Sequence, residues 1–219
     1  MRRVWPALSL AGLLCAQVAQ QANERYQTPE GRASLADTLT AKDRDAKQQP
    51  KAVVEMLGVK PGMTVADVGT GAGYMLPYLS AAAGPAGKVI AEDIYPDFLD
   101  RARRLSADHQ LANVSFVLGN EKDPSLGSGV DLALLVDVYH HLNYPADALA
   151  SLHRSLKPDG RLAIVEYHRQ PDVMNGFAMQ HIRLDAADAI KEIESNGFRL
   201  VTRKEHDPAR QWVAIFIKK

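Results

Sequence analysis

With 219 residues, of which 46% are hydrophobic and 24% are charged, the chain is long enough for one sizeable core. It is short for two domains and a linker. The 26 Lys and Arg residues balance 26 Asp and Glu residues, giving a formal net charge of zero. Because the basic residues are scattered rather than clustered, the composition argues against a nucleic-acid-binding protein.

The chain begins with two arginines and an apolar run from Val4 to Ala16, and then becomes polar. This layout is typical of a secretory signal, and the run is shorter than the ~20 residues that span a bilayer. We predict a signal peptide over residues 1–22 and therefore an exported protein, periplasmic or extracellular, with no stable membrane span after cleavage. An N-terminal membrane anchor and a cytoplasmic location are the alternatives. Cleavage would remove Cys15, the single cysteine of the chain.

Two further regions follow the predicted signal. Residues 23–49 are polar, charged and weakly patterned, which predicts an arm that is partly helical and does not belong to the core. The folded domain is predicted over residues 50–219. Its first helix should begin at Pro50, which suits the first turn of a helix, and end at Gly58.

Short apolar runs then alternate with helical patterns, which favours an α/β fold with a mostly parallel sheet. The predicted strands are Thr64 to Val68, Lys88 to Glu92, Val114 to Leu118, Asp131 to Val136, and Arg161 to Glu166. The predicted helices between them are Tyr74 to Ala83, Asp97 to Leu111, and Ala146 to Leu156. The apolar residues of the second of these helices share one face, so we expect its arginines to be solvated.

The C-terminal end departs from this alternation. Asp185 is placed to cap a helix that ends near Asn196 and Gly197. The segments FRLVTRKE and QWVAIFIKK then read as two strands separated by only a few residues around Pro208. Parallel neighbours need a crossover of about a dozen residues or more, so this pair should form an antiparallel hairpin. The chain is thus expected to have seven strands.

The segment VADVGTGAGY joins the first predicted strand to the helix after it. Such a glycine-rich turn places bare backbone amides at a helix N-terminus, beside a ligand. Gly69 should allow the sharp exit from the strand, while Gly71 and Gly73 should allow close approach. Tyr74 stands where a dinucleotide-binding turn has its last glycine, so a diphosphate is expected to fit poorly.

Acidic residues follow the first two predicted strands. Asp67, at the end of the first strand, would repel a diphosphate and attract an ammonium or sulfonium group. After the second strand, Glu92 and Asp93 compete for the role of accepting both hydroxyls of a ribose, or either could cap the next helix.

Five segments, in this order and spacing, resemble the motifs of class I S-adenosylmethionine-dependent methyltransferases: VADVGTGAGY, VIAEDIYPDFLDRAR, VLGNEKD, VDLALLVDVYHHL and LKPDGRLAIVEY. The resemblance extends from Pro50 to the C-terminus. It implies an α/β, Rossmann-like fold with a seven-stranded, mostly parallel sheet of order 3-2-1-4-5-7-6, strand 7 antiparallel, and helices on both faces. The cofactor it implies is S-adenosyl-L-methionine.

The resemblance also implies where the cofactor would bind. Asp67 would face its methionine part and Asp93 would hold the ribose. Asn120 and Glu121 would lie by the adenine, and Asp137 near the methionyl group. The family often has Asp in place of Asn120, whose amide oxygen can still accept from the adenine amino group. The complete predicted set is Asp67, Gly69, Thr70, Gly71, Gly73, Asp93, Ile94, Asn120, Glu121 and Asp137.

Candidate catalytic residues follow the fourth and fifth strands. Methyl transfer needs mainly alignment, and a base is required only where the acceptor must lose a proton. His140 and His141 follow the fourth strand, and Glu166 and His168 end the fifth, where the carboxyl ends of strands open onto the ligand crevice. Many small-molecule members of the family carry a similar pair of histidines. The alternative is structural: a histidine there could start a helix or bond to a loop.

The same four side chains could in principle hold a metal ion. Adjacent histidines rarely point to one centre, however, and we therefore predict no metal site. His181 and Arg183 would reach the same edge if the loop before them folds over it, as a lid that contacts the acceptor. The alternative for this pair is a solvated approach to the next helix.

The sequence therefore predicts a methyltransferase that uses S-adenosylmethionine and acts on an unidentified, small-molecule acceptor. A non-catalytic domain of an exported protein that binds S-adenosylmethionine or another ligand is the alternative. A nicotinamide oxidoreductase ranks third, disfavoured by Tyr74 and by the terminal hairpin.

Overall fold

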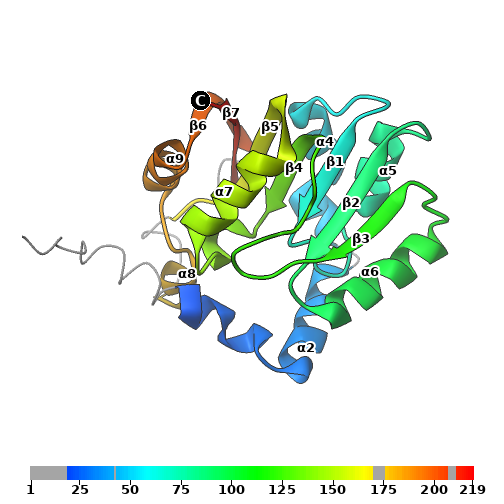
Figure 1. Cartoon of the computed structure of the whole chain (residues 1–219). Helices are drawn as coiled ribbons and strands as arrows, with labels where there is room; N and C mark the ends of the chain where they lie inside the picture. Colours follow the sequence, from blue (N-terminus) through cyan, green and yellow to red (C-terminus); the bar gives the residue numbers. More distant parts are fainter. Residues whose placement is uncertain (1–18, 42, 170–175, 207–210) are drawn as a thin grey trace, which may run out of the picture.

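The computed structural model of the chain describes residues 19–41, 43–169, 176–206 and 211–219 (Figure 1). Most of the predicted signal peptide, and the residues around Pro208, lie outside the described residues. Within the described ranges, no helix is long and apolar enough to cross a membrane.

One seven-stranded sheet forms the centre of the molecule, in the order β3-β2-β1-β4-β5-β7-β6. Its first five strands run parallel, and β7 is antiparallel to both of its neighbours, β5 and β6. The strands are β1 (Thr64–Val68), β2 (Lys88–Asp93), β3 (Val114–Leu118), β4 (Val130–Val136), β5 (Leu156–Tyr167), β6 (Phe198–His206) and β7 (Gln211–Lys218). This order and the reversed last strand confirm the predicted Rossmann-like fold.

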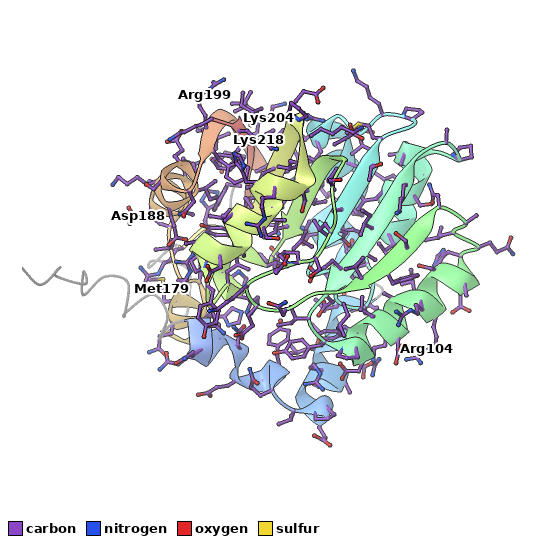
Figure 2. All side chains as sticks on the ribbon, in the orientation of Figure 1. Arg104, Met179, Asp188, Arg199, Lys204 and Lys218 are labelled. Carbon is purple, nitrogen blue, oxygen red and sulfur yellow. The ribbon has the colours of Figure 1, made fainter. Side chains whose placement is uncertain are left out.

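Helices cover both faces of the sheet, as predicted (Figure 1). The helices of one face are α4 (Pro50–Leu57), α5 (Leu76–Ala83) and α6 (Pro96–Asp108), and those of the other face are α7 (Pro145–Ser155) and α9 (Ala186–Ser195). The first group packs on the sheet through residues such as Leu57 and Leu79, and the second through Leu149 and Ile193. Figure 2 labels Arg104, which is exposed on α6, in agreement with a solvated helix face.

Local sequence signals set several boundaries. Gly58, with a φ of 62°, ends α4, and Asp185 accepts a hydrogen bond from the backbone N–H of Asp188 to cap α9. Helix α5 begins at Leu76, two residues later than predicted, because the glycine turn continues through Tyr74. Strand β5 begins earlier than predicted because its start pairs with Val130 of β4 through an irregular register.

The arm between residues 23 and 49 is helical in part. It contains η1 (Glu24–Tyr26), α2 (Pro29–Leu39) and α3 (Arg44–Gln48). Contrary to the prediction that the arm stays outside the core, Ala36 is fully buried and packs with Ala72 and Phe98. Arg32 also forms an ion pair of 2.7 Å with Asp97 of α6. These contacts hold the arm against the carboxyl ends of the parallel strands.

Candidate active site

A cavity lies at the carboxyl ends of β1, β2 and β4 and encloses about 1120 Å³ of empty space, part of it open to solvent. Open parallel sheets place their ligand sites at this edge. Nine of the ten predicted cofactor-binding residues line it: Asp67, Gly69, Thr70, Gly71, Asp93, Ile94, Asn120, Glu121 and Asp137. The tenth, Gly73, does not.

The three glycines of the turn have different roles. All have positive φ, and a Cβ on Gly69 would lie 2.7 Å from the side chain of Val138. A Cβ on Gly71 would meet Leu39 of the arm at 3.2 Å, so this glycine lets the arm approach. A Cβ on Gly73 would lie 3.1 Å from the Cα of Ala102. Gly73 therefore permits close packing on α6, and not the close approach of a ligand that its spacing predicted.

Asp67 is buried at the end of β1, beneath the glycine turn. Its Oδ2 accepts a hydrogen bond of 2.7 Å from the hydroxyl of Thr70. Burial raises the pKa of Asp67 to about 6, and the Thr70 hydrogen bond opposes part of this shift. A buried carboxylate that is costly to ionise alone is well placed to receive a cationic group.

Asp93 ends β2 and is equally buried. One of its carboxylate oxygens accepts from the backbone N–H of Gly71 and the other from that of Tyr95, both at 2.9 Å. Burial raises its pKa to about 6, against the effect of these bonds. The carboxylate thus joins the glycine turn to the start of α6.

Glu92, the competing acidic residue, also lines the cavity. Its Oε2 accepts from the backbone N–H of Gly69 at 3.2 Å, while its buried Oε1 has no hydrogen-bond partner among the described residues. Burial, followed by the neighbouring charge of Asp93, raises the pKa of Glu92 well above its usual value. Both carboxylates therefore face the same part of the cavity.

Two predicted contacts of the adenine lie on the loop after β3. The Oδ1 of Asn120 accepts from the backbone N–H groups of Lys122 and Asp123, at 3.0 and 3.1 Å. Glu121 accepts from the side-chain amide of Asn143 at 2.8 Å. The amide oxygen of Asn120, expected to be available to the adenine amino group, is thus already engaged in its own turn.

Asp137 follows β4 with a φ of 55°, a conformation that costs energy in a residue other than glycine. Its Oδ1 accepts a hydrogen bond of 2.8 Å from the side-chain amide of Gln211 in β7. Gln211 also bonds to Gln48 at the end of the arm. The β7 strand and the arm therefore help to hold Asp137 in place.

His140 and Glu166 form a buried pair. Glu166 Oε2 lies 2.7 Å from His140 Nδ1 and also accepts the backbone N–H of His140. When Glu166 is ionised, that oxygen can only accept, and the ring proton of His140 then lies on Nδ1. His140 Nε2 is buried and lacks a hydrogen-bond partner within the described ranges. Burial raises the pKa of Glu166 and lowers that of His140.

His141, unlike His140, lines the cavity. Its Nδ1 lies 2.7 Å from Asn23 Oδ1, and the Asn23 amide nitrogen donates to the His141 carbonyl at 2.8 Å. Its Nε2 lies 3.4 Å from the hydroxyl of Tyr26. Burial lowers the pKa of His141 well below its usual value. The arm therefore contributes directly to the position of a predicted catalytic residue.

The remaining candidates, His168, His181 and Arg183, lie in different surroundings. His168 does not line the cavity; its Nε2 lies 2.5 Å from Glu205 on β6, so it does not face the crevice as predicted. His181, on α8 (Gly176–His181), lies beside His140 and His141, with ring centroids 4.8 and 5.0 Å away. Arg183 is buried and forms an ion pair with Glu192, so it is not solvated.

Little in the sequence indicated the part played by the arm. Tyr26 packs against Tyr95 and Phe98, with ring centroids about 6 Å apart, and lines the cavity with Leu39 and Arg44. In Figure 1, the arm runs below the carboxyl ends of the strands and beside α8. Tyr26, the single aromatic residue of this polar segment, was the available signal.

The strand order, the glycine turn and the buried carboxylates together define the class I S-adenosylmethionine-dependent methyltransferases. Residues 66–164 match the model of the family described as "Methyltransferase domain". Residues 66–164 therefore form a domain of this class, whose cofactor is S-adenosylmethionine.

Individual relatives agree with this assignment. The ubiquinone/menaquinone biosynthesis C-methyltransferase UbiE of Ectopseudomonas mendocina (strain ymp) is 33% identical over 118 residues, covering 53% of this chain and 46% of the relative. The chain thus spans about half the length of the curated relatives it matches. A S-adenosylmethionine-dependent methyltransferase from Aquifex aeolicus has a TM-score of 0.79 and 28% identity, over 85% of this chain and 98% of that one.

A third similarity concerns the fold alone. Aeropyrum pernix fibrillarin, in complex with natively bound S-adenosyl-L-methionine, has a TM-score of 0.55 and 18% identity, over 73% of this chain and 68% of that one.

Proposed function

We propose that the protein transfers the methyl group of S-adenosylmethionine to a small-molecule acceptor. The observation that carries this proposal is the single cavity that extends from Asp67 and Asp93 to His141 and is walled by Tyr26 of the arm. A wall supplied by the chain itself favours an acceptor small enough to lie beneath it. The net charge of zero argues against a nucleic-acid acceptor.

The buried carboxylates give the cofactor a direction within the cavity. Asp67 and the backbone of the glycine turn receive the methionine end, and Asp93 receives the ribose hydroxyls. The adenine then lies toward Ile94 and the loop after β3. This order leaves the sulfonium near Asp137 and places the methyl group on the side of His141.

The acceptor pocket has the character of a site for an aromatic or otherwise apolar ring. Tyr26, Phe98 and Leu142 line the cavity, and the ring centroid of Tyr26 lies 4.9 Å from that of His141. The UbiE relative is named as a C-methyltransferase of ubiquinone and menaquinone biosynthesis, which supports a small acceptor that is methylated on carbon. We propose an acceptor with an activated ring carbon.

Methyl transfer is an in-line displacement, so positioning alone can supply ~7 to 11 kcal/mol of the barrier reduction. An activated C–H or a hydroxyl must also lose its proton. His141 faces the cavity and can accept that proton at Nε2, while Asn23 fixes the ring through Nδ1. The buried pair of His140 and Glu166 supports the segment from behind.

Calorimetry with S-adenosylmethionine, S-adenosylhomocysteine and NAD provides the first test. We expect the first two to bind and NAD not to bind; preference for NAD would overturn the proposal. The second test follows a labelled methyl group from the cofactor to small phenols and hydroxyquinones, with RNA and protein as competing acceptors. Cofactor binding without transfer to any acceptor would favour a non-catalytic binding domain.

A further inference from the structure

Three histidines from two distant segments meet beside the cavity. His140 and His141 belong to η2 (Tyr139–His141), and His181 ends α8. One nitrogen of each ring can be chosen so that all three atoms lie within 4.8 Å of one another. In a tetrahedral site each imidazole nitrogen lies ~2.0–2.1 Å from the metal ion, so the nitrogens lie closer to one another than the limit of 4.8 Å found here. Small side-chain rotations would bring the three nitrogens together.

The hydrogen bonds of His140 and His141 prepare both rings in the same way. Glu166 receives the Nδ1 proton of His140. The Asn23 amide nitrogen donates to a carbonyl, so its oxygen faces His141 and can only accept the Nδ1 proton of that ring. Both rings thus present an unprotonated Nε2. Metal-binding histidines are held in this manner, with the second ring N–H donated to a carboxylate or carbonyl oxygen.

His140 supplies an independent indication. Its Nε2 is buried and, within the part of the chain that the structure describes, has no hydrogen-bond partner. A buried polar atom of this kind costs free energy unless something binds it. The ring is 4% exposed and is held by Glu166, so it cannot turn its Nε2 to water without breaking that bond.

The surrounding charges are compatible with a cation. The carboxyl group of Glu166 lies directly behind His140 and is itself buried. Among the described cations, Arg183 acts on His140, and an ion pair with Glu192 offsets part of its charge. Arg25 also acts on His181 but is exposed.

We propose that His140, His141 and His181 form a binding site for a divalent transition-metal ion of the zinc type. Three neutral nitrogen ligands suit such an ion and leave a fourth position open. Because His141 also lines the cavity, an acceptor oxygen or a water molecule could take that position. The ion would occupy His141 Nε2, so this site and the proton-accepting role proposed for that atom are alternative uses of the same nitrogen. This departs from the prediction of no metal site, which held that adjacent histidines rarely point to one centre and did not include His181.

The test uses the full-length protein after dialysis against a chelator, titrated with Zn²⁺ in competition with a chromophoric indicator. We expect one equivalent of Zn²⁺ to bind, and His181→Gln to weaken binding by more than ~10-fold, since even loss of a residue that only supports a metal ligand costs about that much. His109→Gln, on an exposed residue far along the chain from the cluster, should bind like the unaltered protein. Cys15 is present in all three proteins and does not affect the comparison.

A second measurement guards against a folding defect. His181→Gln should keep its affinity for S-adenosylmethionine, since His181 does not line the cavity. Co²⁺ bound to the unaltered protein should give the intense visible bands of a tetrahedral site, and these should be lost in the variant. Equal affinity for Zn²⁺ in the unaltered protein and in a folded His181→Gln variant would overturn the proposal. Metal binding is measured directly, so failure of the methyl-transfer proposal would not be confused with failure of this one.

Discussion

The two ends of the cavity are built in different ways. The cofactor end is formed by short stretches of chain that follow β1 and β2, and much of it is backbone: Asp93 holds the N–H of Gly71, and Glu92 holds that of Gly69. The histidine end is assembled from side chains of the arm, η2, β5 and α8. The first can form as soon as the parallel strands pair, while the second depends on packing between distant segments.

This difference predicts that the two ends can be damaged separately. A change at the histidine end should alter turnover and leave the binding of S-adenosylmethionine intact. A change at the cofactor end should weaken the binding of S-adenosylmethionine and leave turnover at saturating cofactor intact. Four substitutions test that separation, beginning with the one expected to have the largest effect.

His140→Gln should lower methyl transfer by ~100-fold, the scale of a misplacement of about 1 Å, because His140 positions the segment that carries His141. Glutamine can still bond to Glu166, which protects the fold. Steady-state rates and calorimetry with S-adenosylmethionine measure the two effects, with His109→Gln as the control. Loss of cofactor binding in a folded His140→Gln variant would show that the two ends are not separable.

Asp93→Ala should weaken S-adenosylmethionine binding by ~1 to 3 kcal/mol, through loss of hydrogen bonds to a charged group. Asp93→Asn retains one acceptor oxygen, so its affinity for S-adenosylmethionine should lie between that of Asp93→Ala and that of the unaltered protein. Asp100→Ala, at an exposed position of α6, is the matched control. Unchanged affinity in Asp93→Ala would remove this residue from the cofactor site.

Asp67→Asn should stabilise the unliganded protein at neutral pH by about 3 kcal/mol, because each of the roughly two units by which the pKa is raised is worth about 1.4 kcal/mol. The folded pKa of about 6 lies above the unfolded value, so the carboxyl group favours folding at low pH and this contribution is lost as the pH rises through 6. Urea unfolding at several pH values measures the difference. The difference in unfolding free energy between the variant and the unaltered protein should be nearly lost near pH 4. A difference that persists at that pH would show that the substitution acts through packing rather than through the charge.

The same contrast explains what the sequence could predict. The strand order and the positions of Asp67 and Asp93 follow from motifs in which residues close in sequence act together. Gly73 looked like a ligand-facing position because spacing cannot distinguish a bare site that faces a ligand from one that faces Ala102.

The histidine end was predicted only in part. His140 and Glu166 could be placed at neighbouring strand ends, and they do form a pair. The partner of His141 is Asn23, which lies 118 positions away in a segment whose polarity predicted an arm outside the core. His181 and His168 both lie in polar segments of the sequence, which does not distinguish their positions. In the structure, the packing of α8 brings His181 beside His140, while His168 pairs with Glu205 outside the cavity.

Asn23→Ala should have the smallest effect, about 1 kcal/mol, because it removes two hydrogen bonds to His141 that are each worth ~0.5 to 1.5 kcal/mol net and are partly replaced by water. We expect the loss to appear as slower turnover with unchanged affinity for S-adenosylmethionine. Gln27→Ala, four residues further along the arm and exposed, is the control. If Asn23→Ala instead weakens cofactor binding and leaves turnover unchanged, the arm serves the cofactor end, and the division between the two ends would have to be drawn elsewhere.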